Sequence, residues 1–198
     1  MNNCLNEKYW TKEYLNILFE AETYEELLTC VAIPLLKDMK KDYTFVYISL
    51  GCMTTGGIAR RKFGSDIDAK LMYSINIDKF KSIQSDISKY INSAILFDQT
   101  VFEDAFVRIN SVKQNWDLLI KEFYWKIFRL GIIDGYILQP YWYESSGTQD
   151  EVRMVVTFSN PRVLELNTGF FKMTVSEKKD LFQKLQWTDI INVSKKLR

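Results

Sequence analysis

Two aspartates separated by one residue, Asp66 and Asp68, are the side chains of this sequence best suited to metal chemistry. They follow a glycine-rich segment, residues 51–57, which itself follows the apolar run of residues 44–50. Carboxylates bind Mg²⁺ well, and glycines let backbone N–H groups approach phosphate oxygens closely. This combination is typical of phosphoryl transfer, in which a cation neutralises phosphate charge while the attacking oxygen is aligned.

The composition excludes several other kinds of site. The chain contains no histidine, which removes Ser-His-Asp catalysis, Cys-His catalysis and histidine-zinc centres. Carboxylates with a hard cation remain, as do lysine, tyrosine, serine or cysteine acting without histidine. The formal charge is only +1, so we expect no bulk attraction to DNA or to an anionic membrane. Any phosphate-binding surface must therefore be local.

The three cysteines, Cys4, Cys30 and Cys52, are widely spaced and include no CxxC pair. An odd number at this spacing indicates neither a disulfide framework nor a zinc site, and it favours a reducing cytoplasm. The amino terminus lacks the apolar core of a signal peptide, and no apolar run approaches the length of a membrane span. We therefore expect a cytoplasmic protein without a membrane partner.

The hydrophobic pattern predicts which elements position the two aspartates. Two amphipathic helices are expected over residues 9–41, split near Glu22 and Thr23. A buried strand is expected over 44–50, and a second over 67–77 with Asp66 and Asp68 at its start. Residues two apart on a strand share one face, so the two carboxylates would project side by side.

The rest of the chain continues this alternation of helix and strand. We expect a helix over 78–93, a strand over 94–97, helical structure over 103–130, a β-hairpin from 136–143 and 152–158, and a capped terminal helix after Thr174. The predicted fold class is α/β, with a small mixed sheet flanked by helices and a C-terminal hairpin. The length fits one domain over 1–198, with a possible subdomain boundary near Gly131.

The run Gly51-Cys52-x-x-Thr55-Gly56, followed by Ser65-Asp66-Ile67-Asp68, resembles the DNA polymerase β-type nucleotidyltransferase superfamily. Its motif is a strand, a Gly-Ser turn containing a further glycine, and Asp-x-Asp. The resemblance covers residues 44–77 directly, with Cys52 where the family has serine.

The resemblance implies a catalytic site that binds Mg²⁺ or Mn²⁺ and takes a nucleoside triphosphate (NTP) as substrate. Its expected metal-binding and catalytic residues are Asp66, Asp68 and a third carboxylate, for which Asp98 is the first choice and Glu151 and Asp134 are alternatives. Its expected nucleotide-binding residues are Gly51, Cys52, Thr55, Gly56, Arg60 and Lys62. The reaction would move a nucleoside monophosphate onto an acceptor, which is a protein, a small hydroxylated molecule, an RNA end or another nucleotide.

Two alternatives stay open at the level of sequence. Asp68-Ala69-Lys70, with Asp42 or Asp66 as a partner, also fits a restriction-type Mg²⁺-dependent nuclease. A catalytically degenerate nucleotidyltransferase fold, serving as a binding or antitoxin-like module, is the other, because Cys52 replaces serine and the third acid has several candidates.

Overall fold

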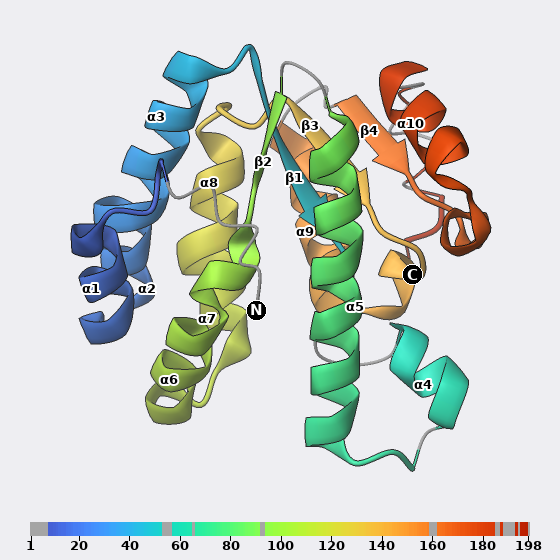
Figure 1. Ribbon diagram of the computed structural model, residues 1–198. Helices are drawn as coiled ribbons and strands as arrows, with labels where there is room; N and C mark the ends of the chain where they lie inside the picture. Colours follow the sequence, from blue (N-terminus) through green and yellow to red (C-terminus); the bar gives the residue numbers. More distant parts are fainter. Residues whose placement is uncertain are drawn as a thin grey trace.

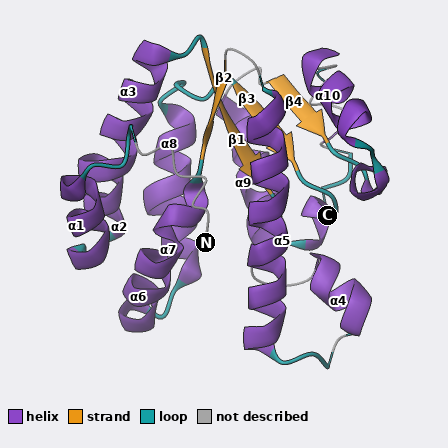
Figure 2. Cartoon of the chain, in the orientation of Figure 1, coloured by secondary structure: helices purple, strands orange, loops and turns teal. Residues whose placement is uncertain are grey.

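The computed structural model describes residues 8–52, 57–64, 66–91, 94–158, 162–184, 187, 193 and 195–197. Four parallel strands form its sheet, in the order β2-β1-β3-β4. The strands are β1 (Phe45–Leu50), β2 (Ala94–Phe97), β3 (Gly135–Leu138) and β4 (Arg162–Glu165). Helices enclose this sheet on both sides (Figure 1, Figure 2). The predicted α/β class is confirmed, and the sheet is parallel throughout where a mixed sheet was expected.

One layer of helices packs on the face of the sheet that Val46 and Ile48 occupy. It contains α1 (Lys12–Glu20), α2 (Tyr24–Glu26), a π-helical segment (Leu27–Ala32), α3 (Ile33–Asp42), a 3-10 turn (Gln99–Phe102), α6 (Glu103–Lys113), α7 (Trp116–Leu119), a second π-helical segment (Ile120–Tyr124), α8 (Trp125–Arg129) and α9 (Ser146–Phe158). The predicted helices in 9–41 and in 103–130 are thereby confirmed.

The opposite face of the sheet carries Tyr47 and Ile137. It is covered by α5 (Ala69–Tyr90), a 3-10 turn (Thr168–Lys172) and α10 (Val175–Lys184). The short helix α4 (Gly57–Phe63) packs on α5, and a 3-10 turn (Trp142–Glu144) precedes α9. Neighbouring residues of β1 are therefore buried on opposite faces, which explains its uninterrupted apolar sequence.

After β1 the chain forms α5 on one face of the sheet and returns as β2, on one side of β1. After β3 it forms α9 on the opposite face and returns as β4, on the other side of the sheet. Such a reversal opens a crevice at the carboxyl ends of the two strands, where open α/β sheets bind ligands. Gly51, directly after β1, sits against the start of the segment after β3. A Cβ added to Gly51 would lie 2.9 Å from Cβ of Gln139, so this close approach requires glycine.

The strand expected over residues 67–77 is wrong, because this segment begins the 22-residue helix α5. Asp68 is its N-cap, and its Oδ1 accepts hydrogen bonds of 3.0 Å from the backbone N–H groups of Lys70 and Leu71. A short apolar stretch fits the period of a strand as well as that of a helix. Here the capping aspartate and the helical pattern beyond Ile77 favour the helix.

The expected β-hairpin is also wrong. Residues 136–138 belong to β3, and residues 152–158 lie in α9. The turn-like Ser145-Ser146-Gly147-Thr148 is the start of that helix, since Oγ of Ser145 accepts a hydrogen bond from the N–H of Thr148. Thr148, Val152 and Val155 are buried at helical spacing. The apolar residues after Glu151 therefore follow the period of a helix, although a short stretch of them also fits the alternation of a strand.

No helix within the described residues is long and apolar enough to cross a membrane.

Candidate active site

A cavity of about 650 Å³ lies at the carboxyl ends of the strands, within the size range of small-molecule sites. Gly51 lines it from the end of β1, and Tyr73 lines it from α5. Further walls come from α6, from α7 with the π-helical segment that follows it, and from the first two turns of α9. The cavity therefore occupies the crevice that the strand order creates.

Glu151 lines this cavity from α9 and is only 5% exposed. The position of α9 is set by Thr148, one turn earlier, whose Oγ1 donates a 2.9 Å hydrogen bond to the backbone carbonyl of Gly51. Burial raises the pKa of the Glu151 carboxyl to about 8, and the negative charges of Glu103 and Asp150 add to this effect. Glutamate is rarely buried to this extent without a partner, so Glu151 is a candidate functional residue.

Glu103 lines the same cavity from the first residue of α6 and is 7% exposed. The 3-10 turn before α6 is capped by Asp98, whose Oδ1 accepts hydrogen bonds from the backbone N–H and the hydroxyl of Thr100. Burial raises the pKa of Glu103 to about 7. The Tyr73 hydroxyl opposes this rise, because it donates a 3.2 Å hydrogen bond to Oε2 of Glu103.

The two carboxyl groups differ in the pH at which they lose their protons. Glu103 has the lower pKa, and its negative charge is one cause of the higher pKa of Glu151. As the pH rises through neutrality, Glu103 is therefore the first of the pair to ionise, and Glu151 keeps its proton to higher pH. A base or nucleophile and a proton donor facing one cavity are the requirements for general acid–base or covalent catalysis.

Another part of the cavity wall is largely apolar. Leu119 and Ile120 line it, together with Trp116, which is 45% exposed. Lys70 and Asp117 add charged groups from α5 and α7, and both are exposed. A ligand with one apolar face and a few polar groups fits this lining.

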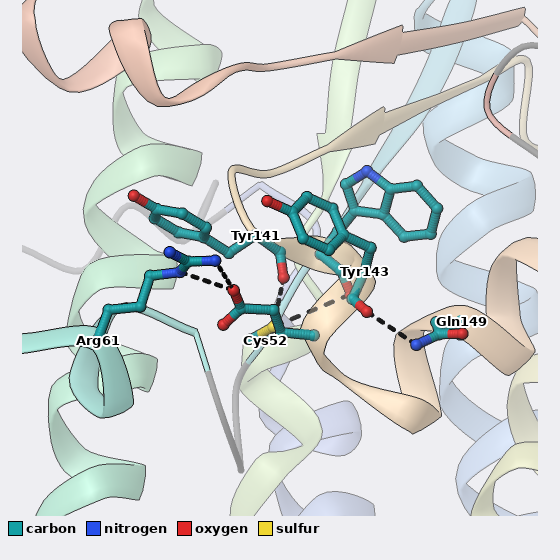
Figure 3. A network of polar contacts seen from close by, with 7 residues as sticks. Cys52, Arg61, Tyr141, Tyr143 and Gln149 are labelled. Atoms are coloured by element: carbon teal, nitrogen blue, oxygen red, sulfur yellow. Dashed lines mark hydrogen bonds and ion pairs between the residues drawn. The ribbon is translucent and has the colours of Figure 1, made fainter. Parts of the chain in front are cut away.

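A polar network fixes the segment that leads from β3 into α9 (Figure 3). Nε of Arg61, on α4, donates a 2.6 Å hydrogen bond to Oε1 of Glu144, and the Arg61 guanidinium lies 4.3 Å from the centroid of the Tyr141 ring. Tyr141 has a φ of +66°, in the left-handed region that side chains other than glycine rarely adopt. The contacts of Arg61 hold Tyr141 in this conformation and join α4 to the turn that precedes α9.

Two further hydrogen bonds belong to this network. The Cys52 thiol donates to the backbone carbonyl of Tyr141 over 2.9 Å, and Nε2 of Gln149 donates to the carbonyl of Tyr143 over 2.8 Å (Figure 3). Both donors reach carbonyls of the turn before α9. The ends of β1, α4 and α9 are therefore joined through this turn.

Three of the acids predicted to bind metal, Asp68, Asp98 and Asp134, make hydrogen bonds that stabilise local structure. Asp68 caps α5, Asp98 caps the 3-10 turn before α6, and Asp66 lies in the exposed turn before α5. Asp134 accepts hydrogen bonds from Lys40 and from the backbone N–H of Val46. Across the part of the chain that the structure describes, no three cysteine or acidic side chains are grouped to hold a metal ion. Asp66, Asp68 and Asp98 form no such group there, so their binding of Mg²⁺ stays a prediction.

The predicted nucleotide-binding residues lie in different surroundings. Gly51 lines the cavity, whereas Thr55 and Gly56 lie outside the described residues. Arg60 and Lys62 are exposed on α4, and Nζ of Lys62 lies 5.0 Å from the centroid of the Phe63 ring. Burial raises the pKa of the Cys52 thiol to about 12, which leaves it protonated at neutral pH.

The nuclease alternative requires acids that meet near Lys70. Asp42 ends α3, where Lys8 and the Tyr9 hydroxyl contact its carboxylate. Figure 1 places that end of α3 at the opposite end of the sheet from the start of α5, which carries Lys70. Asp42 is therefore no partner for Asp68.

Sequence reasoning missed Glu103. Glutamate in the first turn of a helix is common, because it interacts favourably with the helix dipole, so nothing in the local sequence marks it as functional. Glu151 was one of the alternative third acids. The residues next to Glu151 in the sequence do not indicate that its side chain is buried at a cavity.

Comparisons with protein-family models, with curated proteins and with solved structures give no match for this chain.

Proposed function

We propose that this protein is an enzyme that breaks a glycosidic bond of a small molecule, by hydrolysis or by transfer, with Glu103 and Glu151 as its catalytic carboxyl groups. The observation that carries this proposal is that two buried glutamates with raised pKa values line one cavity. They come from different helices, α6 and α9, so their meeting is a product of the fold.

Glycosidic cleavage is a reaction class for which a carboxylate and a carboxylic acid suffice. Glu151, protonated at neutral pH, donates its proton to the leaving-group atom as the glycosidic bond breaks. Glu103, ionised at lower pH, attacks the anomeric carbon or activates the acceptor, and its negative charge stabilises the oxocarbenium-like transition state. The Tyr73 hydroxyl orients the Glu103 carboxylate through its hydrogen bond.

The cavity indicates the size of the substrate. About 650 Å³ accommodates one sugar and a compact leaving group. The apolar wall with Trp116 suits a flat or aromatic leaving group, because aromatic side chains pack well against such faces. A nucleoside or an aryl glycoside meets both conditions.

The test is a panel of nucleosides and p-nitrophenyl glycosides incubated with the purified protein, with release of base, nitrophenol and free sugar followed by absorbance and NMR. We expect cleavage of at least one substrate, with losses of at least about a hundredfold in Glu103→Gln and in Glu151→Gln. Glu20→Gln, at an exposed position of α1, is the matched control and should retain full activity. Cleavage that survives both active-site substitutions would contradict the proposal.

Nucleotidyl transfer, the prediction from the sequence, remains a second proposal. Gly51 and Lys70 support it, since both line the cavity at the end of β1. The protein would release pyrophosphate from a nucleoside triphosphate in the presence of Mg²⁺. Comparing Asp68→Ala with Glu151→Gln separates the two proposals: pyrophosphate release that is lost only in Asp68→Ala would favour nucleotidyl transfer over glycosidic cleavage.

A further inference from the structure

Tyr124 presents a buried hydroxyl without a hydrogen-bond partner among the described residues. It is the last residue of a π-helical segment and is 2% exposed. Its ring packs against Phe106, Phe123 and Phe128, with ring centroids 6.0, 5.3 and 6.0 Å away. A buried unpaired hydroxyl destabilises a fold, and beside a cavity such a donor is available to a group that becomes charged in another state of the protein.

The position of Tyr124 indicates that role. Tyr124 lines the same cavity as Glu103 and Glu151. Among the charges that act on its hydroxyl, Glu151 has the largest effect, followed by Glu103 and Asp98. Single π-helical turns inside helices are frequent at functional sites, and here such a turn carries Tyr124 to the cavity wall.

We propose that Tyr124 is a positioning residue whose hydroxyl donates a hydrogen bond to the Glu151 carboxylate once Glu151 has given up its proton. The catalytic consequence of this hydrogen bond rests on the proposed glycosidic cleavage, but the hydrogen bond itself can be measured without a substrate.

The proton balance explains why the donor is needed. As the glycosidic bond breaks, its electron pair goes to the leaving group, and the Glu151 proton forms the new bond to that atom. A negative charge then remains on a side chain that is almost wholly removed from water. The Tyr124 O–H can stabilise this charge and keeps its own proton, because burial and the nearby carboxylates raise its pKa well above the usual value.

The other charged groups near Glu151 offer little compensation. The titratable groups around it are Glu103 on α6, Asp98 before α6, Asp150 on α9, Tyr73 and Lys70 on α5, and Asp117 on α7. Among the described lining residues Lys70 is the one cation, and it is exposed, so solvent screens its charge. A neutral donor from the cavity wall, such as the Tyr124 hydroxyl, can supply the stabilisation that these charged groups do not.

The decisive measurement is a titration of the Glu151 carboxyl by ¹³C NMR, with its signal assigned through its loss in Glu151→Gln. Tyr124→Phe keeps the ring and removes only the hydroxyl. We expect the Glu151 pKa to rise by about one unit in this variant, because the carboxylate loses a donor. With a cleaved substrate in hand, kcat should fall about tenfold while KM stays unchanged.

Tyr24→Phe is the matched control, because the Tyr24 hydroxyl is also buried without a partner but does not line the cavity. It should leave the Glu151 titration unchanged. Replacement of Tyr124 by 3-fluorotyrosine, whose hydroxyl is a stronger donor, should lower the Glu151 pKa below that of the parent.

An identical Glu151 titration in the parent, in Tyr124→Phe and in the fluorotyrosine protein would overturn the inference. The two proposals fail separately. A Glu151 titration that responds to Tyr124, in a protein that cleaves no glycoside, would refute the proposed function and leave the hydrogen bond established.

Discussion

The Tyr73 hydroxyl on α5 lies 3.2 Å from Oε2 of Glu103 on α6 and donates a hydrogen bond to it. The two helices pack on opposite faces of the sheet, as Ile83 of α5 and Phe106 of α6 show by lying in different hydrophobic clusters. The bond therefore joins the two layers beyond the carboxyl ends of the strands. It also favours the ionised form of Glu103, the group with the lower pKa of the two buried acids.

Removal of this donor should change the pH dependence of the reaction. In Tyr73→Phe the pKa of Glu103 rises, because its carboxylate loses a hydrogen bond while burial is unchanged. The acidic limb of the kcat/KM profile should move to higher pH, and the basic limb should stay. The measurement is a pH–rate profile of the parent and the variant. Tyr90→Phe, on the same helix, serves as control, and an acidic limb common to all three proteins would refute the role of Tyr73.

Stability should fall as the pH rises from about 5 to 7. An unfolded glutamate titrates near pH ~4.3, whereas Glu103 and Glu151 in the folded protein titrate near pH 7 and 8. Between these values the folded state holds protons that the unfolded state has released. Each such carboxyl then costs about 1.4 kcal/mol of unfolding free energy per pH unit. Urea denaturation at pH 5, 6 and 7 measures this slope.

The Glu103→Gln/Glu151→Gln double variant should lose most of that slope. An equal slope in the parent and in the double variant would show that other groups cause it.

Asp68 should prove structural. Asp68→Ala removes the N-cap of α5, so we expect a loss of ~1 kcal/mol and a fall in Tm of roughly 2–4 °C. Asp68→Ser retains a capping oxygen and should recover most of this loss. Thermal denaturation and glycoside cleavage are measured together. Parent-like cleavage in both variants is expected, whereas activity lost equally in both would favour a metal-binding role for Asp68.

The Arg61–Glu144 ion pair should affect activity more than stability. Arg61 is largely exposed, so the pair contributes less than ~1 kcal/mol to folding. It nevertheless holds the turn that leads into α9, and Arg61→Ala should lower kcat/KM several-fold by loosening the position of Glu151 (Figure 3). Arg60→Ala, at an exposed neighbouring position, is the control. Equal kcat/KM values in both variants would argue against this effect.

Cys52 should resist alkylation in the native protein. Its thiol is partly buried, donates to the Tyr141 carbonyl and has a pKa of about 12, so almost no thiolate exists at pH 8. Cys30 is exposed and should react readily. In a Cys4→Ser background, iodoacetamide labelling followed by mass spectrometry should modify Cys30 first, and Cys52 only after addition of urea. Rapid labelling of native Cys52 would contradict this picture.

Much of the framework can be predicted from the sequence. The apolar runs that became β1 and β2, the helices before and after them, and the capping pattern of Thr174 with Glu177 are local signals that the structure confirms. The absence of histidine, also evident from composition, leaves carboxylates as the main candidates for acid–base and metal chemistry. Gly51 is a further local signal. A glycine directly after an apolar strand indicates that another segment packs close to the backbone, as Gln139 does here.

Only the tertiary structure decided which carboxylates are candidates for catalysis. The strand expected over residues 67–77 would place Asp68 beside Asp66 as a metal ligand. In the structure this segment is the helix α5, and Asp68 is its N-cap. Glu103 and Glu151 are far apart in the sequence, and each occupies an ordinary helical position. Both pKa values are raised mainly by burial, and the charge of Glu103 adds to the rise at Glu151. The burial and the shared cavity depend on how the helices pack around the sheet, so neither can be read from the local sequence.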